Sequence, residues 1–325
     1  MKIKSLVRGI APGQLIIQYT DRCNARCPQC GMRVTADFPR SKLTVDEGKR
    51  IIDAAASRGF ESLSFTGGEP LLYLDEIIEL LSYAHKAGIK YTPTGTNGFM
   101  FMGHDKPDFC DKVTRFSEQL AESGIYTFWI SIDSAEPAVH EQMRGLPGVI
   151  RGIEKAIPIM QRHGLYPSAN LGINRNMGGV FDAAESRIFD SYEYFRKSFE
   201  RFYRFVIDMG FTITNCCYPM SVDNNSGQLN AVYQATSAED IVHFTTAERV
   251  SIYRALFDVI SRFRSHIRIF HRSVPYTRSL GNIRRDNHRA IRVGVNANFF
   301  SSMPGTEILT PAGTGDMRIS ENFGR

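Results

Sequence analysis

Apolar residues follow two different periods along the first two thirds of the chain. Short, nearly continuous apolar runs predict buried strands, and the segments between them repeat apolar residues every three or four positions, as one face of a helix does. The predicted strands are 14–20, 61–65, 89–94, 125–132, 166–173 and 211–214. The predicted helices are 44–56, 71–87, 108–122, 148–163 and 187–209. Six strands that alternate with helices indicate a parallel sheet with helices packed outside it.

Local signals mark several helix ends. Thr44 and Glu47 form a capping-box pattern at the start of the first helix, which ends near Gly59. The same pattern at Thr245 and Glu248 predicts one more helix, to about residue 263.

The alternation weakens beyond Cys217. Residues 223–227, Asp-Asn-Asn-Ser-Gly, predict a turn or loop, and the chain from 293 onward has the pattern of short strands and turns. We therefore predict a core at 1–217 and a C-terminal α+β extension at 218–325, which covers the core and contacts the substrate.

Composition narrows the class of protein. A chain of 325 residues with 42% hydrophobic residues can form one large domain or two modest ones. It contains no apolar run of membrane-spanning length, and residues 1–13 are basic without the apolar middle of a signal peptide. Six cysteines in a chain of this length do not indicate a disulfide framework. We expect no membrane partner, a cytoplasmic location and a reducing, low-oxygen environment.

The net charge of +5 is mild, but one segment is strongly basic. Residues 262–292 contain nine arginines, three histidines and a single acid, Asp286. Such a run can bind phosphate, nucleic acid or an acidic peptide. No aromatic-rich RNA-binding motif accompanies it, so a solvated surface with internal ion pairs is the favoured interpretation, and nucleic acid stays an alternative partner.

Three cysteines follow the first predicted strand in the spacing C-x3-C-x2-C: Cys23, Cys27 and Cys30. Three thiolates on a cubane iron–sulfur cluster leave the fourth iron without a protein ligand, so that iron can bind a small molecule. The alternatives are a zinc site and free thiols. Tetrahedral zinc needs four ligands, and the adjacent pair Cys216–Cys217 suits it poorly.

This stretch resembles the cluster motif of the radical S-adenosylmethionine (SAM) enzymes. Thr66-Gly67-Gly68-Glu69-Pro70, after the second predicted strand, resembles the Gly-Gly-Glu motif with which that family holds the methionine amino group of SAM. One position departs from the family pattern. The residue before the third cysteine is usually aromatic and packs near the adenine, and here it is Gln29.

The resemblance covers about residues 14–217 and implies a (β/α)6 partial TIM barrel, a [4Fe-4S] cluster and SAM as cofactors, and an oxygen-sensitive enzyme. It also implies a reductant such as flavodoxin or ferredoxin and a small-molecule or peptide substrate. Residues 305–313 faintly resemble the start of the SPASM extension of many relatives, but they contain no cysteine, so no second cluster is expected.

The candidate site residues all follow predicted strands, and parallel α/β sheets place their sites at the carboxyl ends of strands. The resemblance implies that Cys23, Cys27 and Cys30 bind the cluster. The candidates for SAM binding are Gly67, Gly68, Glu69, Thr96, Asn97, Ser131, Asp133, Asn174 and Arg175.

Several of the SAM candidates also have a structural interpretation. Gly67 and Gly68 can form an ordinary strand-to-helix turn, and Asn97-Gly98 is a turn dipeptide. Asp133 can cap the following helix. Arg175 can be a solvated loop residue.

Cys216 and Cys217 end the sixth predicted strand. Because neighbouring strand residues point to opposite faces, only one of them should face the interior. A thiol there can donate a hydrogen atom to a substrate radical, as in radical SAM epimerases, and the alternative is a buried structural cysteine. We expect Cys110 on its predicted helix to be structural.

The favoured function is that of an enzyme that cleaves SAM reductively and uses the 5′-deoxyadenosyl radical to abstract hydrogen. The outcome is epimerisation, rearrangement or carbon–carbon bond formation. The alternatives are an RNA-modifying radical SAM enzyme and a non-catalytic iron–sulfur electron carrier. A carrier would not need Gly-Gly-Glu, and RNA binding would show marked salt dependence.

Overall fold

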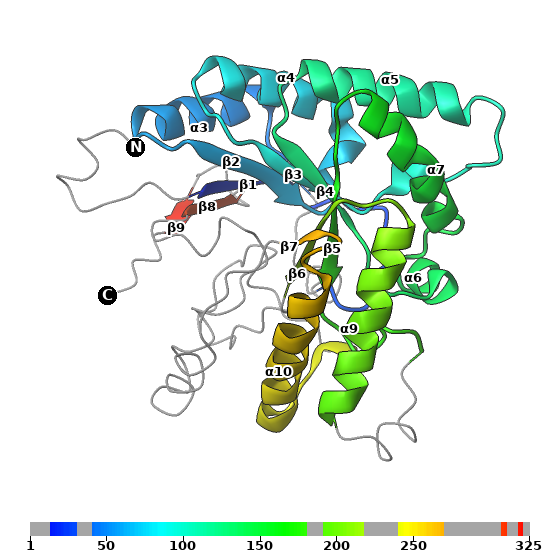
Figure 1. The fold of residues 1–325 in the computed structure, drawn as a ribbon. Helices are drawn as coiled ribbons and strands as arrows, with labels where there is room; N and C mark the ends of the chain where they lie inside the picture. The colour runs from blue at the N-terminus through cyan, green and yellow to red at the C-terminus, as the bar shows by residue number, and fades with distance from the viewer. Residues whose placement is uncertain are drawn as a thin grey trace.

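The computed structural model describes residues 14–30, 41–180, 191–217, 240–269, 307–310 and 318–320. Seven parallel strands lie side by side in chain order (Figure 1). They are β1 (Gln14–Thr20), β2 (Ser62–Gly67), β3 (Pro93–Thr96), β4 (Thr127–Ser131), β5 (Ser168–Gly172), β6 (Ile213–Cys217) and β7 (Arg268–Ile269). The α/β prediction is confirmed, and the expected six strands gain a seventh, because β7 pairs with β6.

Two further strands lie at the other edge of the sheet. β8 (Glu307–Thr310) pairs in parallel with β1, and β9 (Arg318–Ser320) pairs antiparallel with β8. Both β7 and β8 come from the predicted extension and join the sheet of the predicted core. The likeness of this region to SPASM stays a prediction, as does the domain division. Most of the basic run, residues 270–292, lies outside the described residues.

Helices cover the outer side of the curved sheet (Figure 1). They are α3 (Val45–Ser57), α4 (Leu74–Lys86), α5 (Phe109–Glu122), α6 (Pro137–Arg144), α7 (Val149–Arg162), α9 (Ser191–Asp208) and α10 (Thr246–Phe263). Short 3-10 helices occupy Pro70–Tyr73, Phe99–Phe101 and Asp240–Val242. None of these described helices is long and apolar enough to cross a bilayer.

The predicted caps are present. Thr44 and Glu47 form a complete capping box at α3, and Thr245 and Glu248 form one at α10. The helix α6 was missed, although Pro137 in its first turn and the left-handed Gly145 after its last residue are the usual signals for the two ends.

The two faces of β4 show how the sheet divides core from site. Phe128 and Ile130 are buried, and Phe128 meets Phe116 of α5 edge to face at 6.2 Å. The alternate residues Thr127, Trp129 and Ser131 are only partly buried, so they face the inner side of the sheet. An added Cβ at Gly95 of β3 would lie 2.1 Å from Trp129 Nε1. The indole therefore lies across this glycine on the inner face.

Helices α9 and α10 lie side by side and close the last part of the sheet (Figure 1). Tyr203 of α9 and Phe263 of α10 stack with ring centroids 5.4 Å apart. Phe195, Phe199 and Phe202 of α9 are buried in the same hydrophobic core.

Truncation of Phe202 to alanine should lower the free energy of unfolding by about 3–5 kcal/mol, since Phe202 is fully buried and leaves a cavity. Phe257→Ala on α10 is the matched control, because its side chain is 47% exposed. Urea denaturation measures both variants. Equal losses for the two would contradict the described packing of α9.

Candidate active site

The cysteine loop, residues 21–30, leaves β1 at its carboxyl end. Cys23 is exposed, and Cys27 and Cys30 are partly buried. The Cys30 N–H donates to the Cys27 carbonyl at 3.2 Å, which tightens the end of the loop. Cys23 Sγ accepts from the Ala25 N–H at 3.4 Å and from Asn97 Nδ2 at 3.8 Å. Such N–H donors suit a thiolate, so the loop fits a metal-bound sulfur.

Burial raises the pKa of the Cys27 thiol to about 12, and the Arg144 charge acts against that rise. A thiolate at this position therefore needs a metal to displace its proton. Among the described residues, no three Cys, His, Asp or Glu side chains lie close enough to hold a single metal ion.

Gly67 and Gly68 pack directly on the backbone of the cysteine loop. An added Cβ would lie 2.1 Å from the Thr20 carbonyl oxygen at Gly67 and 2.0 Å from the Arg22 carbonyl oxygen at Gly68. The Gly68 N–H donates to Thr20 O at 2.7 Å, and the Glu69 N–H donates to Arg22 O at 2.8 Å. The absence of side chains at Gly67 and Gly68 therefore lets the cysteine loop lie against the end of β2. The sequence did not reveal this structural role.

The Glu69 carboxylate is buried and joins β2 to the end of β3. Oε1 accepts from the Leu71 N–H and the Thr96 hydroxyl, each at 3.0 Å. Oε2 accepts from the Asn97 N–H at 2.7 Å. Burial raises the pKa of Glu69 to about 7, although these three hydrogen bonds lower it. Each carboxylate oxygen can accept two hydrogen bonds, so Oε2 keeps capacity for one further donor.

Asn97 connects the end of β3 to the cysteine loop. Its Nδ2 donates to Asn24 Oδ1 at 2.8 Å, and its Oδ1 accepts from the Phe99 N–H at 2.9 Å. Gly98 follows with a left-handed φ of 84°. Asn97 is therefore part of a turn, and the same turn brings it to the cysteines.

Asp133 lies between the cysteine loop and α6. Its Oδ2 accepts from Gln29 Nε2 at 2.6 Å and lies 2.7 Å from Arg144 Nε. Asp133 does not cap α6, because the N-cap of that helix is Glu136. Its backbone is also fixed: the N–H donates to His140 Nδ1 at 3.0 Å, and the carbonyl accepts from Asn174 Nδ2 at 2.9 Å.

Arg175 extends away from the cysteine loop toward α10. Its guanidinium pairs with Glu248 at 2.5 Å and donates to the carbonyls of Asp240 and His243 at 3.1 and 2.7 Å. A contact between Arg175 and SAM would require this ion pair to open. Ser131 is the last residue of β4 and is partly buried on the inner face of the sheet. Its partner in β5 is Asn170.

The two cysteines of β6 face opposite sides of the sheet. Cys216 Sγ lies 3.4 Å from the Tyr203 hydroxyl of α9, within the hydrophobic core. Cys217 Sγ donates to Asn170 Oδ1 at 2.9 Å and accepts from Asn215 Nδ2 at 3.5 Å. Burial raises the pKa of Cys216 to about 12 and that of Cys217 further, so both stay protonated thiols at neutral pH.

Four neighbours of the site were not singled out from the sequence: Arg144, Trp129, Asn170 and Asn215. Arg144 stands at the end of a helix that the periodicity did not predict. The inner-face position of the other three follows from strand alternation around Ser131 and Cys217, once the register between strands is known.

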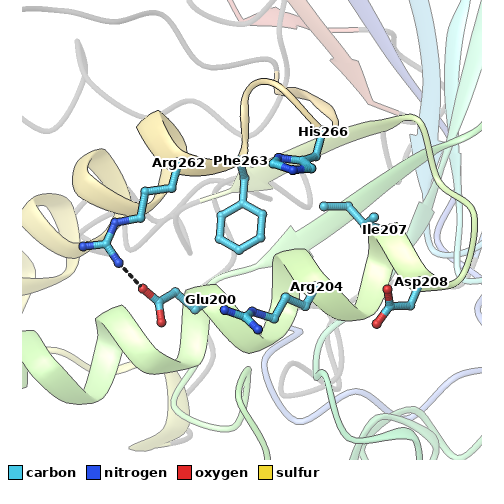
Figure 2. A pocket seen from close by; sticks show the side chains of 7 residues that line it. All are labelled: Glu200, Arg204, Ile207, Asp208, Arg262, Phe263 and His266. Atoms are coloured by element: carbon cyan, nitrogen blue, oxygen red, sulfur yellow. Dashed lines mark hydrogen bonds and ion pairs between the residues drawn. The ribbon is translucent and has the colours of Figure 1, made fainter.

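A surface cavity lies elsewhere. A hollow of about 390 Å³ between the carboxyl ends of α9 and α10 is lined by Arg204, Ile207, Arg262, Phe263 and His266, with Glu200 and Asp208 (Figure 2). These helix ends lead into the amino ends of β6 and β7, at the edge of the sheet opposite the cysteine loop. This hollow is therefore separate from the candidate active site.

The geometry defines a parallel α/β domain with a three-cysteine loop at the carboxyl edge of its sheet. Residues 17–176 match the Radical SAM superfamily, so the chain contains a radical SAM superfamily domain. Members of this superfamily are enzymes that use a [4Fe-4S] cluster and S-adenosylmethionine. The predicted class and cofactors are thereby confirmed at the level of the family.

Similar proteins share this domain. An AdoMet-dependent heme synthase of Methanosarcina barkeri is 31% identical over 152 residues, 47% of this chain and 40% of that protein. A GTP 3′,8-cyclase of Vibrio cholerae is 32% identical over 153 residues, 45% of this chain and 42% of that protein. The match thus spans about two fifths of these curated relatives.

The fold is also shared with a solved structure, Streptococcus suis SuiB bound to S-adenosylmethionine. The TM-score is 0.58 at 16% identity, over 94% of this chain and 60% of that one. At this identity the likeness concerns the fold, and it agrees with the expected partial TIM barrel.

Gly68→Ala should prevent the cysteine loop from reaching the end of β2, since the new methyl group would overlap the Arg22 carbonyl. We expect anaerobically reconstituted Gly68→Ala to bind much less iron than the wild type. Gly172→Ala at the end of β5 is the control, because an added Cβ there is 3.7 Å from its nearest neighbour, Asp133 Oδ1. Full iron content in both variants would contradict the role of Gly68.

Proposed function

We propose that this chain is a radical SAM enzyme that binds a [4Fe-4S] cluster through Cys23, Cys27 and Cys30 and acts on a substrate at the inner face of its sheet. When bound, the cluster supplies the electron that cleaves the sulfonium of SAM, and the resulting 5′-deoxyadenosyl radical abstracts a hydrogen atom from the substrate. The observation that carries the proposal is the backbone contact between the cysteine loop and Gly67-Gly68-Glu69.

The proposal assigns a binding role to each of several residues of the chain. The second acceptor position on Glu69 Oε2 would bind the ammonium group of SAM. Thr96 and Asn97 hold the Glu69 carboxylate in place through their hydrogen bonds to it. Ser131 and Asp133 at the end of β4 are the candidates for the ribose, and Asn174 supports Asp133. Arg175 remains a proposed contact only if its pair with Glu248 opens.

The substrate would lie against the inner-face residues Trp129, Asn170, Asn215 and Cys217. They combine an indole surface, two amides and a thiol that is protonated at neutral pH. Cys217 is the inward-facing member of the cysteine pair and is therefore the proposed hydrogen-atom donor. The thiyl radical left on its sulfur would return to the thiol by taking one electron from the proposed flavodoxin or ferredoxin and one proton from solvent. Cys216 points to α9 and has a structural role.

The wider function rests on the same domain. The heme synthase and the cyclase match this chain only over the shared domain, so neither named reaction is transferred to it. We propose a small-molecule or peptide substrate and a flavodoxin or ferredoxin as reductant. The non-catalytic electron carrier is the second candidate, and consumption of SAM by the reduced protein distinguishes the two.

The cluster is tested by reconstitution under anaerobic conditions. We expect about four irons per chain, as one cubane cluster requires, and loss of that iron when Cys23, Cys27 and Cys30 are all replaced by alanine. Iron analysis and the absorbance of the cluster measure this. A cluster that survives the triple change, or about eight irons per chain, would falsify the single-cluster assignment.

Glu69→Gln should keep the cluster and weaken SAM binding. The loss of a charge-assisted hydrogen bond corresponds to about 1.5–3 kcal/mol, or roughly tenfold to a hundredfold in Kd. Glutamine is preferred to alanine because it keeps the side-chain volume and one acceptor oxygen for the Leu71 N–H and the Thr96 hydroxyl. Calorimetry of SAM binding is the measurement, with Glu61→Gln at the other end of β2 as the control. An unchanged Kd for Glu69→Gln would remove Glu69 from the SAM site.

Cys217→Ala should still form 5′-deoxyadenosine but yield no finished product, because the substrate radical is not quenched. In deuterated water the wild-type product should gain one deuterium, since thiol protons exchange with solvent. Cys216→Ala is the internal control and should give labelled product as the wild type does. Mass spectrometry of reactions with candidate substrates measures 5′-deoxyadenosine and the deuterium content of the product for all three proteins. Labelled product from Cys217→Ala would make that thiol structural and assign the hydrogen to another exchangeable donor, whereas a wild-type product without deuterium would favour a rearrangement or an addition.

A further inference from the structure

Helix α6 ends directly on the cysteine loop. The Arg26 N–H donates to the carbonyl of Arg144, the last residue of α6, at 2.9 Å. Gly145, with a left-handed φ of 67°, ends the helix, and an added Cβ there would lie 3.8 Å from the Arg26 side chain. Arg26, which lies between Cys23 and Cys27, is therefore held by the end of α6.

The side chain of Arg144 turns into the protein beside the same loop. Its guanidinium is 8% exposed and lies 2.7 Å from Asp133 Oδ2, and the Asp133 side chain is 2% exposed. Gln29, the neighbour of Cys30, donates to that same oxygen at 2.6 Å. A buried cation and a buried anion thus lie next to the cysteine loop and are tied to it at Arg26 and at Gln29.

The two charges do not act equally on the sulfurs. At Cys27 burial has the largest effect and raises the pKa, the Arg144 charge lowers it, and the Asp133 charge raises it by a smaller amount than Arg144 lowers it. At Cys23 burial has the largest effect and raises the pKa, the Glu69 charge also raises it, and Arg144 is among the groups that lower it. Arg144 and Asp133 carry opposite charges beside the same loop, so they act on the cysteine sulfurs in opposite directions.

A charge pair in this position has a consequence for electron transfer. The potential of an iron–sulfur cluster depends on the net charge around it and on hydrogen bonds to its sulfurs. A buried charge acts strongly because the surrounding dielectric is low. Reduction adds one negative charge, so a nearby cation favours it and a nearby anion opposes it.

We propose that the Asp133–Arg144 pair sets the reduction potential of the cluster, with Arg144 raising it and Asp133 both limiting that effect and holding the guanidinium in place. This rests on the proposed cluster but not on the proposed substrate or radical chemistry. It also assigns a role to Gln29, because the Gln29 amide joins Asp133 to the cysteine loop. Arg144 and Asp133 are positioning and tuning residues, and the mechanism proposed above does not require Arg144 to touch the substrate.

The test is a potentiometric titration of the reconstituted full chain, followed by electron paramagnetic resonance of the reduced cluster, without SAM. Arg144→Gln should shift the potential to a more negative value, and Asp133→Asn should shift it to a more positive one. Arg144→Lys keeps the charge and should restore a value near that of the wild type. Arg196→Gln is the control, because Arg196 pairs with Glu193 and Glu200 on α9.

Shifts of the reduction potential in opposite directions for Arg144→Gln and Asp133→Asn distinguish an effect of charge from a purely structural role. Shifts in the same direction, or unchanged potentials in Asp133→Asn, would overturn the proposal. If Arg144→Gln loses the cluster, Asp133→Asn and Arg144→Lys still decide the question by the same criteria. Iron content is measured on every sample, so failure of the wild type to form a cluster would be recognised separately as failure of the proposed function.

Discussion

The site depends on one close backbone contact. The strand end at Gly67 and Gly68 has no side chains, and the carbonyls of Thr20 and Arg22 occupy the space where Cβ atoms would otherwise be. Two backbone hydrogen bonds, from Gly68 and Glu69 to those carbonyls, fix the start of the cysteine loop against β2. Because the loop begins there, the position of Cys23 relative to Glu69 is set by backbone geometry rather than by a flexible side chain.

Buried polar side chains connect the cysteine loop to the ends of the neighbouring strands. Glu69 joins β2 to β3, Asn97 joins β3 to the loop, and Asp133 joins the loop to β4 and α6. Buried polar groups of this kind are stabilising only when they are satisfied. The network therefore favours one arrangement of the cysteine loop, which is what a cluster with an open iron needs.

Much of the fold was predictable, because hydrophobic periodicity reports which segments are buried. The six predicted strands and the capping boxes at Thr44 and Thr245 are present. The two-residue β7 is too short to show a period, and the short helix α6 contains a buried Arg144 that obscures its apolar face. At the site, spacing identified the cysteines and Glu69. It could not show that Arg175 turns to Glu248, or which of Cys216 and Cys217 faces inward, since both depend on contacts between segments far apart in the chain.

The chain contains a single tryptophan, and the structure places it on the inner face of the sheet, across Gly95. Indole fluorescence responds to the polarity around the ring, so tryptophan emission, excited apart from the 13 tyrosines, reports on the inner face of the sheet. The proposed iron–sulfur cluster would absorb broadly at the wavelengths at which indole emits, so its binding would lower the emission of Trp129. The same ring makes occupation of the inner face visible without any added label.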